Sequence, residues 1–125
     1  MRVSISVDVP DLEAGIAFYG GTFGLTGAAR PGAGMVLLTA GDQRLLLLAR
    51  PEGSPPFPGA AAARSYAPHW TPVHLDFHID NLRAVRDRAL AAGARQEAWF
   101  EPPGRPPAGF FRDPFGHGFC LIGNL

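Results

Sequence analysis

Two stretches of the chain alternate between apolar and polar residues, and the second repeats the first at an offset of 70 positions. Residues 4–12 align with residues 74–82 without a gap, with apolar side chains at positions 5, 7 and 9 and again at 75, 77 and 79. A period of two places alternate side chains on opposite faces of an extended chain, so both stretches predict a β-strand. The polar faces carry the first functional candidates, which are Ser4, Ser6 and Asp8 in one copy and His74, Asp76 and His78 in the other.

A helix is predicted directly after each of these strands. Asp11 precedes the first helix and can cap it, because its carboxylate accepts a hydrogen bond from a free amide of the first turn. Asn81 stands at the same place before the second helix. Apolar residues then follow at helical spacing, and Gly24 and Gly93 end the two patterns. Both halves of the chain therefore begin with the same strand–helix unit.

Three more strands are predicted after each helix. They cover residues 25–30, 34–39 and 44–50 in the first half and residues 94–100, 108–112 and 118–123 in the second. Asp113–Gly116, with the sequence Asp-Pro-Phe-Gly, is a strong turn signal before the last strand. The order β-α-β-β-β thus occurs twice, and the sequence predicts an α+β fold of two tandem modules.

The stretch between the modules breaks the pattern. Residues 51–72 contain six prolines and predict a connector without regular elements. The expected organisation is a first module over residues 1–50, a linker over 51–72 and a second module over 73–125, which together form one compact domain.

Composition narrows the function by exclusion. Eleven arginines, without any lysine, balance eleven acidic residues, so the formal net charge is zero and no basic surface for nucleic acid is expected. No apolar run approaches the roughly 20 residues that span a bilayer, and no signal peptide is recognisable. The single cysteine, Cys120, excludes an intrachain disulfide and fits a reducing compartment. We therefore expect a cytoplasmic protein.

Six short motifs follow one another along the chain, namely Val9–Glu13, Ala17–Tyr19, Phe23–Leu25, His74–Asp80, Ala89–Ala94 and Asp113–His117. Their order and spacing resemble the vicinal oxygen chelate superfamily, which includes glyoxalase I, extradiol dioxygenases and the bleomycin- and fosfomycin-resistance proteins. The second half is most similar to the glyoxalase-like subgroup. The resemblance implies two modules whose sheets curl around a shared cleft, commonly completed by formation of a homodimer.

The resemblance also implies where a metal would be held. Enzymes of the superfamily take one ligand from the first strand of each module and another from the last strand, which correspond here to Ser4, His74 and Cys120. Only His74 is a usual ligand for a hard or borderline divalent ion. The matching strand of the first module, Leu45–Leu48, contains neither histidine nor carboxylate. The standard metal site is therefore predicted to be absent.

Strand geometry leaves one alternative open. At about 3.4 Å per residue, His74 and His78 lie roughly 13 Å apart and cannot share an ion, whereas either one lies about 7 Å from Asp76. His74 with Asp76, or Asp76 with His78, could therefore share an ion, and zinc, nickel, iron or manganese are the candidate metals. Cys120 as thiolate could join either pair, which would favour zinc or another thiophilic ion. The competing interpretation of Cys120 is a small buried apolar residue.

The leading hypothesis is a glyoxalase- or bleomycin-resistance-like protein that binds a small organic ligand in its cleft as a homodimer, with no metal cofactor. The alternative is a divergent metal-dependent lyase, isomerase or dioxygenase that uses His74 with Asp76 or Cys120. A third possibility is an accessory domain with a vestigial cleft. The residues expected to line the cleft are Ser4, Ser6, Asp8, His74, Asp76, His78, Trp99, Phe110, Arg112 and Cys120.

Overall fold

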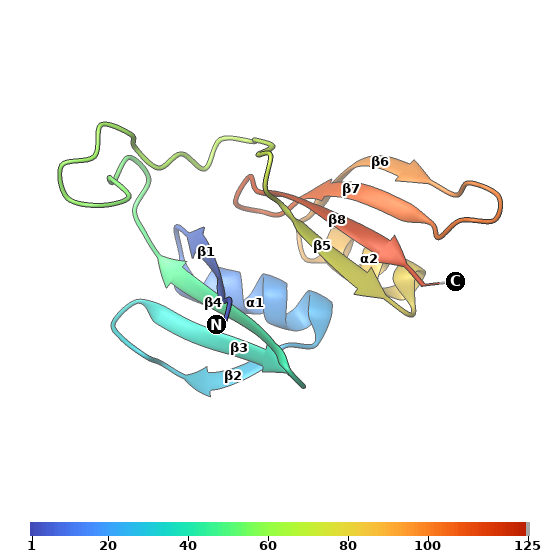
Figure 1. Cartoon of the computed structure of the whole chain (residues 1–125), viewed down its shortest axis with the longest axis horizontal. Coiled ribbons are helices and arrows are strands. Elements are labelled where there is room, and N and C mark those ends of the chain that lie inside the picture. The colour runs from blue at the N-terminus through green and yellow to red at the C-terminus, as the bar shows by residue number, and fades with distance from the viewer. Residues whose placement is uncertain (125) are drawn as a thin grey trace. The chain divides into compact units, whose positions relative to one another are not determined.

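The computed structural model describes residues 1–124, without the side chain of residue 28, and contains two helices and two four-stranded mixed sheets in that range (Figure 1). The elements are β1 (Ile5–Val9), α1 (Leu12–Phe23), β2 (Thr26–Ala29), β3 (Met35–Ala40), β4 (Gln43–Ala49), β5 (Leu75–Ile79), α2 (Leu82–Ala91), β6 (Arg95–Phe100), β7 (Ala108–Arg112) and β8 (Gly118–Gly123). The order β-α-β-β-β occurs twice, so the predicted α+β fold of two similar modules is confirmed.

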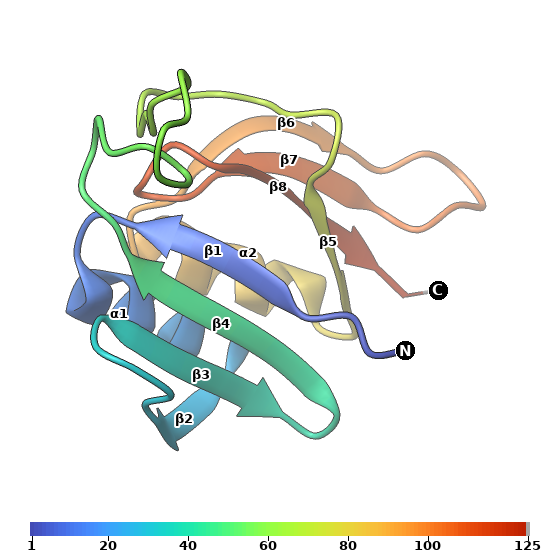
Figure 2. The ribbon, with the colours of Figure 1, turned by 60° about the vertical axis from the view of Figure 1, so that its left-hand side comes forward.

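The first compact unit covers Met1–Tyr66. Its strands lie in the order β1-β4-β3-β2, and β1 is parallel to β4 while the other pairs are antiparallel (Figure 2). Helix α1 packs closely on one face of this sheet at Gly15, which has no side chain. A Cβ atom added there would lie only 3.1 Å from Val9 and 3.2 Å from Leu47. Val9, the last apolar residue of the alternating pattern in β1, is fully buried in the core between this sheet and α1.

The ends of α1 are those that the sequence predicts. The Asp11 carboxylate accepts a hydrogen bond of 2.9 Å from the amide of Ala14, and Gly24 ends the helix with a left-handed φ of 67°. Asn81 also stands directly before its helix, α2, but its side chain makes no capping hydrogen bond. The repeat therefore keeps the position of the cap and not its interaction.

The second compact unit begins at Ala67. Its strand order, β5-β8-β7-β6, repeats that of the first unit, with β5 parallel to β8. Helix α2 covers one face through Leu82, Val85 and Ala89, and the stacked rings of Phe111 and Phe119 fill the core beneath it.

The turn between β7 and β8 is organised by a buried carboxylate. Asp113 is 4% exposed and accepts hydrogen bonds from the amides of Phe115 and His117 at 2.8 and 2.9 Å. The predicted Asp-Pro-Phe-Gly turn is therefore confirmed, and it fixes where β8 begins.

The proline-rich segment contains no helix or strand, but part of it is closed by hydrogen bonds. The amide of Gly53 donates to the carbonyl of Arg64, and the amide of Arg64 donates to the carbonyl of Ser54, both at 2.8 Å. Further along, His69 forms an isolated bridge with His117. Within residues 1–124, neither helix is long and apolar enough to cross a membrane.

Candidate functional site

One face of the second sheet is covered by α2, and the other carries most of the candidate residues. In this sheet Asp76 on β5 pairs with Cys120 on β8, and Cys120 pairs with Phe110 on β7, so the three form one row across the strands. We call this surface the open face. It consists of Trp70, His74, Asp76, Glu97, Phe100, Phe110, Arg112 and Cys120.

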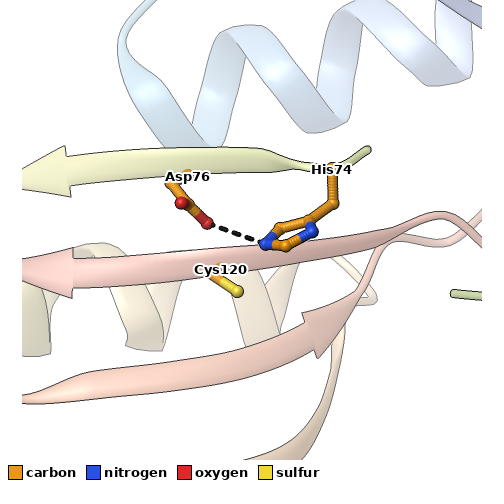
Figure 3. A group of neighbouring side chains, drawn as sticks. All are labelled: His74, Asp76 and Cys120. Atoms are coloured by element: carbon orange, nitrogen blue, oxygen red, sulfur yellow. Dashed lines mark ion pairs between the residues drawn. The ribbon is translucent and has the colours of Figure 1, made fainter. Parts of the chain in front are cut away.

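Three side chains of the open face bring potential ligand atoms together (Figure 3). The Nε2 atom of His74 lies 3.1 Å from Oδ1 of Asp76, two residues further along the chain and on the same face of β5. One ligand atom from each of His74, Asp76 and Cys120 lies within 4.8 Å of the others. His74 and Asp76 are exposed, whereas Cys120 on β8 is only 4% exposed and lies beneath them.

The environment of Cys120 disfavours its thiolate. Burial, followed by a hydrogen bond to Asp76 and the negative charge of that carboxylate, raises the pKa of the thiol to about 11. The thiol is therefore protonated at neutral pH. A cysteine that acts as a nucleophile needs the opposite shift. In this state Cys120 donates a hydrogen bond rather than attacking a substrate.

Aromatic rings continue the open face next to this group. The ring centroids of His74 and Trp70, of Trp70 and Phe110, and of Phe110 and Phe100 are each 5.9 Å apart, in edge-to-face arrangements. Trp70, Phe110 and Phe100 are respectively 41%, 39% and 53% exposed. The protein thus presents three adjacent large apolar rings to solvent, with a polar group at one end.

Trp70 comes from the segment before β5 and is fixed on the sheet by two contacts. Its indole Nε1 donates a hydrogen bond of 2.5 Å to Oε2 of Glu97 on β6. Its ring lies over Gly118, where an added Cβ atom would come within 2.4 Å of it. The other oxygen of Glu97 forms an ion pair with Arg112. Glu97 therefore joins β6, β7 and the tryptophan.

The sequence pattern did not reveal Glu97, and it suggested a cleft position for Trp99. The register of β6 against β7 shifts between Gln96 and Ala98, which is a β-bulge at Glu97. A bulge adds one residue and reverses the alternation beyond it. Glu97 consequently lies on the open face, whereas Trp99 lies on the helix face.

Contacts with α2 establish the position of Trp99. The guanidinium of Arg86 lies 4.5 Å from the centroid of its ring, and its Nε1 donates to Glu101 at 2.9 Å. The structure therefore does not bring Trp99 together with His74 and Phe110.

The candidates of the first unit have different surroundings. Asp8 accepts a hydrogen bond of 2.7 Å from Nε of Arg64, which anchors the closed loop to β1. Ser4 and Ser6 are exposed. His78 is exposed on β5, two residues beyond Asp76, and is not a member of the group formed by His74, Asp76 and Cys120.

Comparison with known proteins agrees with this architecture. The family model of the glyoxalase-like domain matches residues 4–122. No curated protein sequence matches the chain significantly. A glyoxalase-related enzyme from Fulvimarina pelagi is similar in structure, with a TM-score of 0.75 and 21% identity over 99% of this chain and 88% of that chain.

Two further structures widen the comparison. A lactoylglutathione lyase from Agrobacterium tumefaciens gives a TM-score of 0.65 and 23% identity over 99% of this chain and 93% of that chain. A mutant of the fosfomycin resistance protein FosX from Listeria monocytogenes, complexed with Mn(II) and 1S,2S-dihydroxypropylphosphonic acid, is also similar. It gives a TM-score of 0.73 and 18% identity over 100% of this chain and 91% of that chain. These structures share the fold of the chain, and the family match over almost its whole length shows that the chain belongs to the glyoxalase-like domain family.

Proposed function

We propose that this protein binds a small organic molecule, with an aromatic or apolar part, on the open face of its second unit. The observation that carries the proposal is the exposed row of Trp70, Phe110 and Phe100 beside the polar pair of His74 and Asp76. Small-molecule sites combine apolar walls with a few polar groups that fix orientation, and this surface offers both.

The energetics of the row favour a ligand that covers it. Exposed aromatic rings in contact with one another leave apolar surface in water, and covering it contributes about 25 cal/mol per Å². A ligand ring could stack on Trp70 or Phe110, while a polar substituent reached His74 or Asp76. Because Glu97 and Gly118 hold Trp70 in place, little side-chain order would have to be created on binding.

The structural neighbours support a small organic compound as the class of ligand, but they do not identify the compound. The names of the lyase and the resistance protein refer to small organic compounds. At 18–23% identity the likeness extends to the fold, and functions differ widely on one fold. We therefore propose sequestration of, or resistance to, an organic compound without choosing among the neighbours' substrates.

The proposed function involves no manganese ion of the kind present in the FosX complex. Manganese prefers carboxylate, carbonyl and water oxygens, whereas the donor group of this chain contains a buried thiol. At the other position implied by the family, Ser4 offers only a hydroxyl. These residues do not fit a Mn²⁺ site such as that of the FosX complex.

A metal-dependent lyase, isomerase or dioxygenase is the second candidate. The approach of His74, Asp76 and Cys120 to within 4.8 Å favours it over other enzyme classes. This second candidate function predicts metal-dependent turnover, which the substitution His74→Ala should abolish. Wild-type protein that binds no divalent ion would exclude it.

We also propose that the protein forms a homodimer. β1 and β5 are edge strands of their sheets, and large apolar side chains are exposed on or beside them, with Ile5 at 41% and Val73 at 86%. Unpaired edges with apolar side chains are commonly covered by association. Sedimentation equilibrium should give twice the mass of one 13.3 kDa chain; a single chain mass up to high micromolar concentration would contradict the dimer.

Thermal unfolding in the presence of a compound panel tests the ligand proposal. The panel should contain fosfomycin, lactoylglutathione, bleomycin and simple aromatic acids and alcohols. A compound at 100 times its Kd stabilises the folded state by about 2.7 kcal/mol, which raises Tm by several degrees. At least one ring-bearing compound is expected to give such a shift. No shift with any compound would contradict the proposal and favour a vestigial cleft.

A further inference from the structure

His74 and Cys120 stand at two of the positions from which the superfamily takes metal ligands, and Asp76 joins them in a group whose donor types differ from the usual ones. Its three side chains offer an imidazole nitrogen, a carboxylate oxygen and a sulfur atom, and all three belong to the second unit. The pairing of β5 with β8 produces the arrangement, because it places Cys120 directly opposite Asp76, with His74 two residues away on the same face. Asp76 and Cys120 lie on the paired strands β5 and β8, and His74 directly precedes β5.

The spacing of the donors suits a tetrahedral ion. Zinc binds nitrogen at about 2.0–2.1 Å and thiolate sulfur at about 2.3 Å, so neighbouring donors of a tetrahedron lie roughly 3.3–3.6 Å apart. The nitrogen of His74 and the oxygen of Asp76 are already 3.1 Å apart. The sulfur of Cys120 lies within 4.8 Å of both, a gap that side-chain rotation can close.

We propose that His74, Asp76 and Cys120 bind a thiophilic divalent cation, with zinc as the best match. The thiolate selects zinc and cobalt over manganese, magnesium and calcium, which prefer oxygen donors. Binding breaks the S–H bond of Cys120, passes its proton to solvent and forms the metal–sulfur bond. Three protein donors leave one position of the tetrahedron for water or an added ligand, which is the arrangement of catalytic rather than structural zinc.

The surroundings of the group assist binding. His74 and Asp76 are exposed, so an ion can reach the donors from solvent, while Cys120 provides a fixed floor. The ring of Trp70 packs edge-to-face against His74 and is itself held by Glu97. This ring contact restricts the orientation of the imidazole that would bind the ion. The site shares His74 and Asp76 with the proposed ligand surface, but binding of the ion requires no organic ligand.

Cobalt titration of the full chain, freed of metal with a chelator, tests the site without an activity assay. A cobalt–thiolate bond produces a sulfur-to-metal charge-transfer band in the near ultraviolet, and d–d absorption reports tetrahedral geometry. The expected result is saturation at one cobalt per chain, displacement by zinc and no displacement by manganese. Cys120→Ser should lose the charge-transfer band, and His74→Ala and Asp76→Asn should each weaken binding at least tenfold.

His78→Ala is the matched control, because His78 is an exposed histidine on the same face of β5 and outside the donor group. It should bind cobalt as the wild type does. Absence of the band in the wild type, or its persistence in Cys120→Ser, would overturn the site. Should Cys120→Ser fail to fold, the variants of the two exposed donors decide the question. Phe110→Ala should bind cobalt normally, so that failure of organic-ligand binding and failure of the metal site remain distinguishable.

Discussion

Glu97 and Trp70, 27 residues apart in the chain, are joined by a 2.5 Å hydrogen bond from the indole to the carboxylate. The bond fastens the end of the proline-rich segment to β6. It also holds the tryptophan between His74 and Phe110, at the junction of the polar and aromatic parts of the open face. The proposed binding surface therefore depends on a carboxylate that would not itself touch a ligand stacked on the rings.

Replacing Glu97 by glutamine should loosen Trp70 and destabilise the protein. The carboxylate and its partner Arg112 have side chains 26% and 21% exposed, so a charged hydrogen bond here contributes about 1.5–3 kcal/mol. Urea unfolding should show a loss in that range, and tryptophan fluorescence should shift towards the red. The control is Glu13→Gln, which removes an exposed pair with Arg30 and should cost about 0–1 kcal/mol. Equal losses in the two variants would contradict this role of Glu97.

Gly118→Ala should displace Trp70 from the sheet. An added methyl group would lie 2.4 Å from the indole ring, so the ring must move, at a cost of about 1–3 kcal/mol. The cobalt affinity should fall less than the affinity for an aromatic ligand, because the ring is part of the proposed ligand surface and only a neighbour of the metal donors. Gly21→Ala is the control, since nothing lies within 4 Å of its added methyl group and alanine favours a helix. An unchanged fluorescence spectrum in Gly118→Ala would show that Trp70 does not lie there in solution.

Arg64→Ala should open the proline-rich loop. The guanidinium donates to Asp8 at 2.7 Å, to the hydroxyl of Ser54 at 3.2 Å and to the carbonyl of Pro55 at 2.5 Å, and it is only 17% exposed. Removing it should speed proteolytic cleavage between residues 51 and 65 at least tenfold and lower stability by about 1–3 kcal/mol. Arg30→Ala, which loses an exposed pair, should leave both measurements near the wild-type values. Unchanged cleavage in Arg64→Ala would mean that the loop is held by its backbone alone.

Stability without metal should fall in alkaline solution because of Cys120. Burial and then Asp76 raise the pKa of the folded thiol from 9.0 to about 11. The unfolded chain consequently loses this proton first. The contribution of the thiol to the free energy of unfolding is fully present below about pH 9 and is lost as pH rises from about 9 to about 11. Burial also raises the pKa of Tyr66, which acts in the same direction. Urea unfolding of the wild type should therefore decline more steeply with pH than that of Cys120→Ala. If the stabilities of the two proteins declined equally with pH, the raised pKa of Cys120 would be contradicted.

The elements of the fold follow from local pattern, and much of the site does not. Alternation in β5 predicted that His74, Asp76 and His78 share one face, and the cap of Asp11 and the turn at Asp113 are confirmed because they depend on neighbouring residues. The spacing of Asp76 and Cys120 depends on strand pairing between residues 44 apart, which sequence distance alone does not fix.

The positions of Glu97 and Trp70 on the open face could not be derived from the periodicity of the sequence. The bulge at Glu97 reversed the alternation of β6, so that Glu97 and Trp99 exchanged the roles expected from a regular strand. Trp70 belongs to the proline-rich segment, whose path is set by its contacts with Gly118 and Glu97 rather than by any periodicity.

Calorimetric titration of the best compound from the panel tests the central claim most directly, with wild type, Phe110→Ala and Phe57→Ala compared side by side. Phe57 is also an exposed phenylalanine, at 64%, but it lies in the proline-rich loop rather than on the open face. Loss of a stacking ring should weaken binding by about 1–3 kcal/mol, or roughly 5- to 150-fold, in Phe110→Ala alone. Equal affinity in all three proteins would contradict the placement of the ligand on the open face.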